Sequence, residues 1–137
     1  MTTPTRLRDW QERFEAFTAE RRAMPFQWGA NDCCTFVVDC VEATTGVNIC
    51  APGLRDHTDA LTAYRVVDAH GGITAITTAA LGEAVAATYA TTGDVVLVDM
   101  AGRDALAICN GTTALMPSDH GLVSVCMSTA KTAWRLA

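Results

Sequence analysis

The hydrophobic pattern of this chain changes its period close to residue 93, and this change constrains the fold more than any other feature. Before that point, apolar residues recur at three- and four-residue steps, which is typical of amphipathic helices. After it, short apolar runs such as residues 95–98 alternate with turn residues, which is typical of β-strands. Helices first and strands second predict an α+β fold, in which the helices pack on an antiparallel sheet.

Four helical segments are expected before the change of period. The first ends near Pro25, because the residue before a proline disfavours the helical conformation. The second ends at Gly46, since a glycine commonly follows the last turn of a helix. The predicted helices span residues 5–23, 32–45, 56–70 and 73–81; the first is capped by Thr5 and carries an apolar face of Leu7, Trp10, Phe14 and Phe17.

Four strands and a terminal edge strand are expected after the change of period. Gly93 permits the turn into the first strand, with Asp94 beside it, and the pair Asn110–Gly111 is a strong hairpin signal. The predicted strands are residues 95–99, 105–109, 113–116, 122–126 and an edge strand at 133–137. We therefore expect one domain over residues 1–137, with N-terminal helices packed on a C-terminal antiparallel sheet of four to five strands.

Composition excludes several classes of function. Half of the 137 residues are hydrophobic and 18% are charged, which indicates a well-packed globular domain. The net charge of −5 argues against binding to nucleic-acid phosphates and to acidic membranes. No apolar run reaches the length of a membrane span, and the first residues lack the apolar segment of a signal peptide.

The stretch over residues 26–41 carries the strongest candidate site. Trp28 is expected to fix a tight turn, Gly29 to let another backbone approach closely, and Asp32 to cap the following helix. Cys33 then lies in the first helical turn, where the positive end of the helix dipole favours a thiolate and lowers a thiol pKa. The alternative is a capped core helix that contains small apolar cysteines.

Six cysteines are many for a chain of this length. No C-x-x-C pair is present and the three histidines are scattered, so the usual zinc signatures are absent and no metal or cofactor is predicted. Reduced, mostly structural thiols fit this pattern. An iron–sulfur or redox site that includes Cys33, Cys34, Cys40 and Cys50 is a further hypothesis.

Two stretches resemble the NlpC-type cysteine peptidases, which have a papain-like fold. Those enzymes carry an aromatic-Trp-Gly turn and then Asp-Cys-Ser-Gly-Leu-Val; here Trp28 and Gly29 precede Asp-Cys-Cys-Thr-Phe-Val at residues 32–37. Their Gly-Asp-Leu-Val-Phe strand is similar to residues 93–97. The resemblance covers about residues 24–126, and it implies a papain-like domain with Cys33 at the position of the nucleophile.

The resemblance breaks at the position of the general base. The next strand of the family begins His-Val-Gly-Ile-Tyr, and the matching residue here is Ala105. The polar residue that orients this histidine is matched by Leu115 or Met116. Without an imidazole in reach of Cys33, attack on an amide and protonation of the leaving amine both lack a proton carrier.

Other histidines are weak substitutes for the missing base. His120, with Asp119 beside it, lies in a predicted turn from which it could approach Cys33; the alternative is a solvated loop histidine. We expect His57 and His70 to be solvated or capping residues at the two ends of the third helix. Asp104, next to the vacant position, is a poor base for a thiol because an unperturbed carboxyl group has a pKa of about 4.

The chain also resembles a compact subgroup of this superfamily from phage and prophage tail modules, which shares its terminal Ala-Trp-Arg and an apolar residue at the histidine position. This implies a catalytically inactive tail-tip or tail-assembly component, made in the host cytoplasm, incorporated in the virion and bound to other tail-tip or hub proteins. The alternative is an active cysteine peptidase or amidase that cuts peptidoglycan stem peptides during genome entry. Candidate docking residues are Trp10, Phe14, Trp134 and Arg135, because Trp and Arg are favoured interface anchors.

Overall fold

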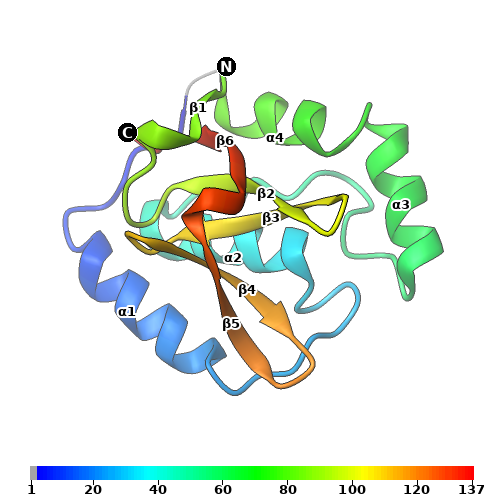
Figure 1. The fold of residues 1–137 in the computed structure, drawn as a ribbon, viewed down its shortest axis with the longest axis horizontal. Helices are drawn as coiled ribbons and strands as arrows, with labels where there is room; N and C mark the ends of the chain where they lie inside the picture. The colour runs from blue at the N-terminus through cyan, green and yellow to red at the C-terminus, as the bar shows by residue number, and fades with distance from the viewer. Residues whose placement is uncertain (1–2) are drawn as a thin grey trace.

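Four helices precede a six-stranded antiparallel sheet in the computed structural model, which describes residues 3–137 (Figure 1). The predicted α+β class is therefore confirmed. The helices are α1 (Trp10–Arg21), α2 (Cys33–Thr45), α3 (Ala60–Ala69) and α4 (Ile73–Leu81). The strands are β1 (Val85–Ala86), β2 (Val95–Met100), β3 (Arg103–Cys109), β4 (Thr113–Ser118), β5 (Gly121–Cys126) and β6 (Ala130–Trp134), with short 3₁₀ turns at Ala87–Tyr89 and Met127–Thr129.

The sheet has the strand order β1-β6-β2-β3-β4-β5. The prediction that the C-terminal strand lies at an edge of the sheet is therefore wrong. The segment does form a strand, but β6 lies inside the sheet, where Ala133 pairs with Val96 of β2 and with Val85 of β1. The physical reason is burial, because Ala133 and Trp134 have no exposed surface and need neighbours on both sides. The sheet consequently has six strands, more than the four to five expected.

Helix α2 begins and ends where its sequence predicts. The carboxylate of Asp32 accepts the backbone N–H of Thr35, and the hydroxyl of Thr35 accepts the backbone N–H of Asp32, which closes a capping box. At the other end Gly46 adopts a left-handed conformation with φ of 76°. The cap fixes the direction in which Cys33, the first residue of α2, leaves the turn.

Helix α1 starts five residues later than predicted, and Thr5 does not cap it. The segment before α1 bonds to distant parts of the chain instead: the backbone N–H of Arg6 donates to the carbonyl of Ala137 (2.9 Å), and that of Leu7 to the carbonyl of Thr44 (2.8 Å). Tertiary pairing therefore competes with helix extension here. Helix α3 also starts late, because Asp59 forms its own capping box with Thr62.

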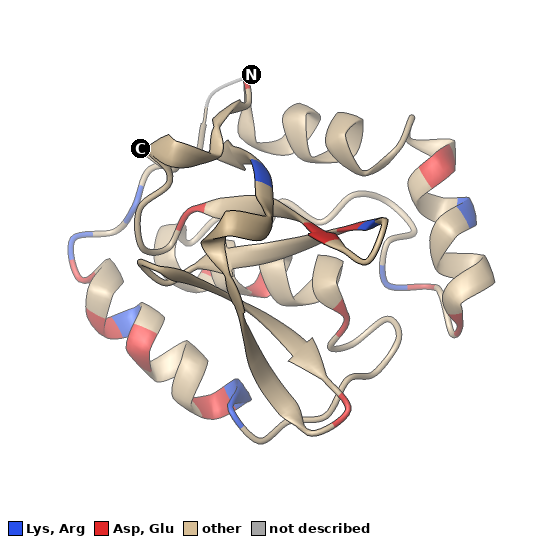
Figure 2. Ribbon diagram, in the orientation of Figure 1, with Lys and Arg blue, Asp and Glu red and all other residues tan. Residues whose placement is uncertain are grey.

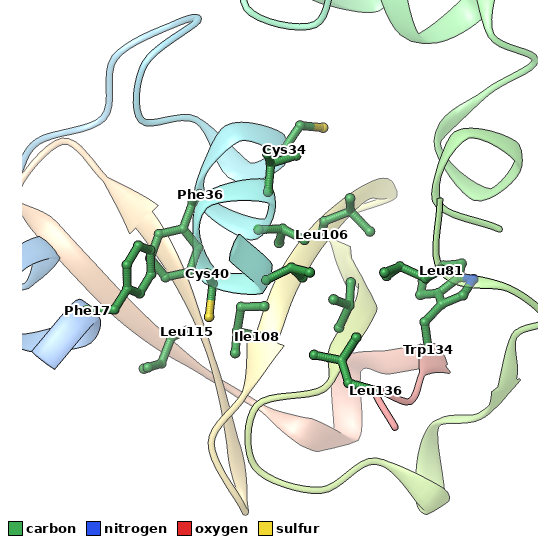
Figure 3. Packing of buried hydrophobic residues seen from close by; sticks show 14 of the residues in the cluster. Phe17, Cys34, Phe36, Cys40, Leu81, Leu106, Ile108, Leu115, Trp134 and Leu136 are labelled. Atoms are coloured by element: carbon green, nitrogen blue, oxygen red, sulfur yellow. The ribbon is translucent and has the colours of Figure 1, made fainter. Parts of the chain in front are cut away.

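The main core lies between α1, α2 and one face of the sheet (Figure 3). Phe17 of α1 and Phe36 of α2 pack with ring centroids 5.3 Å apart. At the other end of this core Trp134 is fully buried and donates its indole N–H to the hydroxyl of Thr78 (3.2 Å). A second, smaller cluster covers the opposite face of the sheet and consists of Val96, Val98, Ala107, Cys109, Ala114, Met116 and Ala133.

Two of the four predicted docking residues belong to this core. Phe14 is 5% exposed and Trp134 has no exposed surface, so neither side chain is accessible to a partner and these predictions are wrong. Trp10 is half-buried beneath the guanidinium of Arg6, which lies 4.1 Å from its ring centroid. Arg135 is exposed and remains a candidate.

Asp94 connects the two ends of the chain to the sheet. Its buried carboxylate accepts from the guanidinium of Arg6 (2.7 Å), the backbone N–H of Leu136 (3.0 Å) and the backbone N–H of Thr91 (2.9 Å). Gly93 before it has φ of 90°, and a Cβ there would lie 3.2 Å from the ring of Trp10. This pair therefore fixes the entry into β2.

Charged residues of both signs lie on α1 and α3, whereas most of the ribbon of the sheet is uncharged (Figure 2). No helix within the described part of the chain is long and apolar enough to cross a membrane.

Candidate functional site

A pocket of about 430 Å³ lies at the N-terminal end of α2. It is lined by the first turn of α2, the loop before it, the loop between α2 and α3, one face of α3, the β2–β3 hairpin and β4. Figure 1 shows the tip of the β2–β3 hairpin pointing toward α3, which stands at the edge of the molecule. Asp32, Cys33 and His57 all contribute to the lining.

Cys33 borders this pocket as a partly exposed residue in the first turn of α2. Hydrogen bonding with the neighbouring Cys34 thiol lowers the pKa of Cys33, although burial and the charge of Asp32 oppose the shift. The same interaction, together with burial, raises the pKa of Cys34 well above that of an ordinary thiol. Burial also raises the pKa of the core residue Cys40 to about 12. Within this group the thiolate therefore forms first on Cys33.

A buried carboxylate–imidazole pair lies next to Cys33. His57 Nε2 bonds to Oδ2 of Asp32, and the two residues are only 4% and 2% exposed. The same Oδ2 accepts the backbone N–H of Gly29 (2.8 Å), so the carboxylate is fully engaged. The expectation that His57 is solvated or caps α3 is therefore wrong. Its second ring nitrogen, Nδ1, is buried and has no hydrogen-bond partner.

A close backbone approach places His57 against Asp32. Gly29 has φ of 80°, and a Cβ at this position would lie 2.7 Å from the carbonyl oxygen of His57 and 2.8 Å from that of Arg55. Only glycine tolerates both the dihedral angle and the contact. Trp28, which is 37% exposed, packs edge-on against Phe26 (4.7 Å between centroids) and against the His57 ring (5.9 Å).

The position of the family's general base also lines the pocket. Ala105 of β3 pairs with Val98 of β2 and contributes a methyl group, and Met116 of β4 contributes a thioether chain. Leu115 packs in the main core instead. Across residues 3–137, imidazole nitrogens bond to Asp32 and to the carbonyl of Pro52, and none bonds to the sulfur of Cys33.

The two other histidines do not line the pocket. His120 is exposed in the turn between β4 and β5, so the structure does not bring this candidate base to Cys33. His70 is exposed at the C-terminal end of α3, where Nε2 lies 3.1 Å from the carbonyl oxygen of Pro52. Asp104 lines the pocket and accepts from Lys131 (2.8 Å).

The cysteines are all unpaired in the structure. Cys34, Cys40 and Cys109 are buried, Cys126 is exposed, and Cys33 and Cys50 are intermediate. In the described part of the chain, no three Cys, His, Asp or Glu side chains gather closely enough to hold a metal ion. The structure therefore offers no ligand set for the iron–sulfur hypothesis among these residues.

The fold and the pocket define an α+β protein with a cysteine at the start of its central helix and a buried carboxylate–imidazole pair beside it. A family model described as "Domain of unknown function (DUF6950)" matches residues 5–136. Since this match spans nearly the whole chain, the protein belongs to that family. No curated protein matches the chain in the sequence comparison.

The lowered pKa of Cys33 predicts the order in which the thiols react. Because a lowered pKa leaves more thiolate at a given pH, iodoacetamide should alkylate Cys33 at lower pH than Cys34 or Cys40. Replacing Cys34 by alanine removes the stabilising thiol and should shift the Cys33 profile to higher pH. Peptide-resolved mass spectrometry between about pH 5 and pH 9 measures both profiles.

The matched control is Cys34→Ser, which retains a hydrogen-bond donor and should keep more of the shift. A Cys33 profile that is identical in wild type and Cys34→Ala would contradict the assigned cause.

Proposed function

We propose that this protein is a structural component of a phage tail tip or of its assembly, built on an NlpC-type papain-like domain that does not cleave peptides. The support is the resemblance of residues 24–126 to that superfamily, together with the composition of the pocket. In this proposal the protein is made in the host cytoplasm, resides in the virion and binds other tail-tip or hub proteins.

The observation that carries the proposal is that Ala105, at the position of the family's base, lines the same pocket as Cys33. A cysteine peptidase needs a group that takes the thiol proton and later gives it to the leaving amine. A methyl group does neither. The lowered pKa of Cys33 favours the thiolate, but it supplies no acid for the amine.

The nearby imidazole is bound to a structural group. His57 Nε2 bonds to the same carboxylate oxygen that holds the turn at Gly29, while the other oxygen caps α2 through Thr35. This pair therefore joins the loop between α2 and α3 to the start of α2. Its contribution is to the architecture of the pocket.

The second candidate is an active cysteine peptidase or amidase that acts on peptidoglycan stem peptides. The observation that favours it is the free Nδ1 of His57 on a residue that lines the same pocket as Cys33. Hydrogen bonds of catalytic groups are often long in the absence of substrate. In this alternative His57, oriented by Asp32, replaces the histidine that the family places on its strand.

A muropeptide digest separates the two candidates. We expect the wild-type protein and Cys33→Ser to release the same background of stem-peptide fragments, as measured by liquid chromatography and mass spectrometry, because no proton carrier serves Cys33. Cys33-dependent release in the wild type would defeat the structural proposal. If that release also disappears in His57→Gln, the second candidate gains its base.

The variant Ala105→His serves as a positive control for the site. It restores an imidazole at the position that the family uses, in a pocket that both Ala105 and Cys33 line. Faster alkylation of Cys33 at neutral pH in this variant is the expected result, whether or not amide cleavage returns.

A further inference from the structure

We infer that α3 is a lid on the pocket at the start of α2, and that opening of this lid controls the access of large molecules to Cys33. The lid consists of residues 60–69. The inference goes beyond the proposed function, because it holds whether or not Cys33 takes part in peptide cleavage.

Helix α3 is attached to the rest of the molecule by little buried surface. None of its ten residues is buried, whereas α2 buries nine of its thirteen. Leu61 and Tyr64 are 58% and 48% exposed. Among the described residues of α3, Val66 is the one that packs against the main core, and it is only half-buried. A segment with few buried apolar contacts opens at a lower free energy than the core does.

The joint after α3 is the N–Cα bond of Gly72. The backbone N–H of Gly72 donates to the carbonyl of Val67 in α3 (3.0 Å), and its carbonyl accepts the N–H of Ile76 in α4 (3.0 Å). Rotation about the bond between these two groups therefore leaves the hydrogen bonds of both helices in place. Gly72 has φ of 105°, and among the described residues a Cβ at this position would meet no neighbouring atom within 4 Å. Glycine adopts a wide range of φ, and hinges are often built on such small residues.

The joint before α3 lies between His57 and Thr58. His57 is buried and bonded to Asp32 at the start of α2. Thr58 and Asp59 are exposed, and their backbone N–H groups donate to the hydroxyl of Thr62 in α3 (3.1 and 3.3 Å). These two residues are therefore expected to move with the helix, while His57 stays with α2.

The contacts that hold the lid closed are exposed. Arg103 of the β2–β3 hairpin donates to the hydroxyl of Tyr64 (2.9 Å), and in residues 3–137 this is the one side-chain hydrogen bond that joins α3 to the sheet. At the end of α3, Nε2 of His70 lies 3.1 Å from the carbonyl oxygen of Pro52. Water competes for such exposed groups, so each bond contributes little net free energy.

The lid forms one wall of the pocket. Ala63, Tyr64 and Val67 line the pocket from α3, and Arg103 lines it from the β2–β3 hairpin. With this wall in place the volume is about 430 Å³, which limits the size of a group that can approach Cys33. Rotation of α3 away from the hairpin removes the wall and leaves the rest of the lining unchanged.

The test compares alkylation of Cys33 by a small and a large reagent. Iodoacetamide is small, whereas N-(1-pyrenyl)maleimide carries a four-ring aromatic group directly on its reactive ring. The variant Tyr64→Phe keeps the aromatic ring in the pocket wall but removes the hydroxyl that accepts from Arg103. We expect it to raise the rate with the pyrenyl reagent about two- to tenfold, the usual effect of one hydrogen bond, and to leave the iodoacetamide rate unchanged. Peptide-resolved mass spectrometry measures both rates at Cys33.

The matched control is Tyr89→Phe. Tyr89 is 63% exposed and does not line the pocket, so its substitution should change neither rate. An unchanged pyrenyl rate in Tyr64→Phe would overturn the inference. An equal rise for both reagents would also overturn it, because it would report a more reactive thiol rather than a wider opening. The same rise in Tyr89→Phe would show that the effect is not specific to the lid.

Hydrogen exchange followed by mass spectrometry gives a second readout. A helix of ten residues is marginal in water without packing, so each opening exposes the backbone amides of α3 to exchange. We expect these amides to exchange faster than those of α2, and Tyr64→Phe to accelerate exchange in α3 alone. Equal protection of α3 and α2 in the wild type, or equal acceleration of both helices in the variant, would contradict a separately moving lid.

Discussion

Replacing Asp94 by alanine is expected to lower the free energy of unfolding by about 3–5 kcal/mol, the usual cost of removing one partner from a buried ion pair. The carboxylate is 1% exposed and accepts from Arg6, Leu136 and Thr91. Its loss leaves the guanidinium of Arg6, which is itself largely buried, without its charge partner. Urea unfolding followed by circular dichroism measures the change at constant m-value.

The matched control is Asp104→Ala. Asp104 also accepts from a cation, but this pair with Lys131 is exposed on both sides, and such pairs contribute little to stability. We expect almost no change in the unfolding midpoint for this control. Equal effects of the two substitutions would show that Asp94 does not join the chain ends to the sheet in the way described.

Replacing Asp32 by alanine is the second substitution with a large expected effect. It removes the cap of α2, which contributes about 1 kcal/mol, and it leaves buried His57 without a partner, which costs about 1–3 kcal/mol more. The combined loss should be about 2–4 kcal/mol in the free energy of unfolding, as measured by the same urea method.

Asp59→Ala provides a close control for that result. Asp59 closes the same type of capping box with Thr62 at the start of α3, but it is exposed and holds no buried histidine. A clearly smaller loss is expected there. If the two substitutions destabilise equally, the pair formed by Asp32 and His57 contributes nothing beyond the cap.

Much of the fold follows from local signals in the sequence. The period of the apolar residues predicts the α+β class, and helices α2 and α4 match the predicted ranges within one residue. In α2 the cap residue and the terminal glycine lie within one turn of the helix, so nearby residues decide its ends. Such local agreement is where sequence-based prediction works best.

The errors arise where distant segments compete. Residues 4–7 bond to Ala137 and Thr44 instead of extending α1, and β6 lies inside the sheet because Trp134 must be covered. Neither contact can be predicted from the pattern of residues near it in the sequence. The apolar face of the first helix was nonetheless informative, since Phe14 and Phe17 both reach the core.

Only part of the candidate site can be predicted from the sequence. Asp32 and Cys33 are adjacent and predict a capped helix with a cysteine in its first turn. His57, however, follows 25 residues after Asp32, in a loop. The close contact between the backbones of Gly29 and His57 places His57 against Asp32. A glycine after a tryptophan signals a close approach, but it does not say which segment approaches.

The backbone hydrogen bond between Arg6 and Ala137 has a consequence for how the domain can be joined to other segments. Residues 4–6 and Ala137 lie side by side at the upper left of Figure 1, whereas α3 lies at the right. A segment joined at either of these ends would leave the pocket at the start of α2 uncovered.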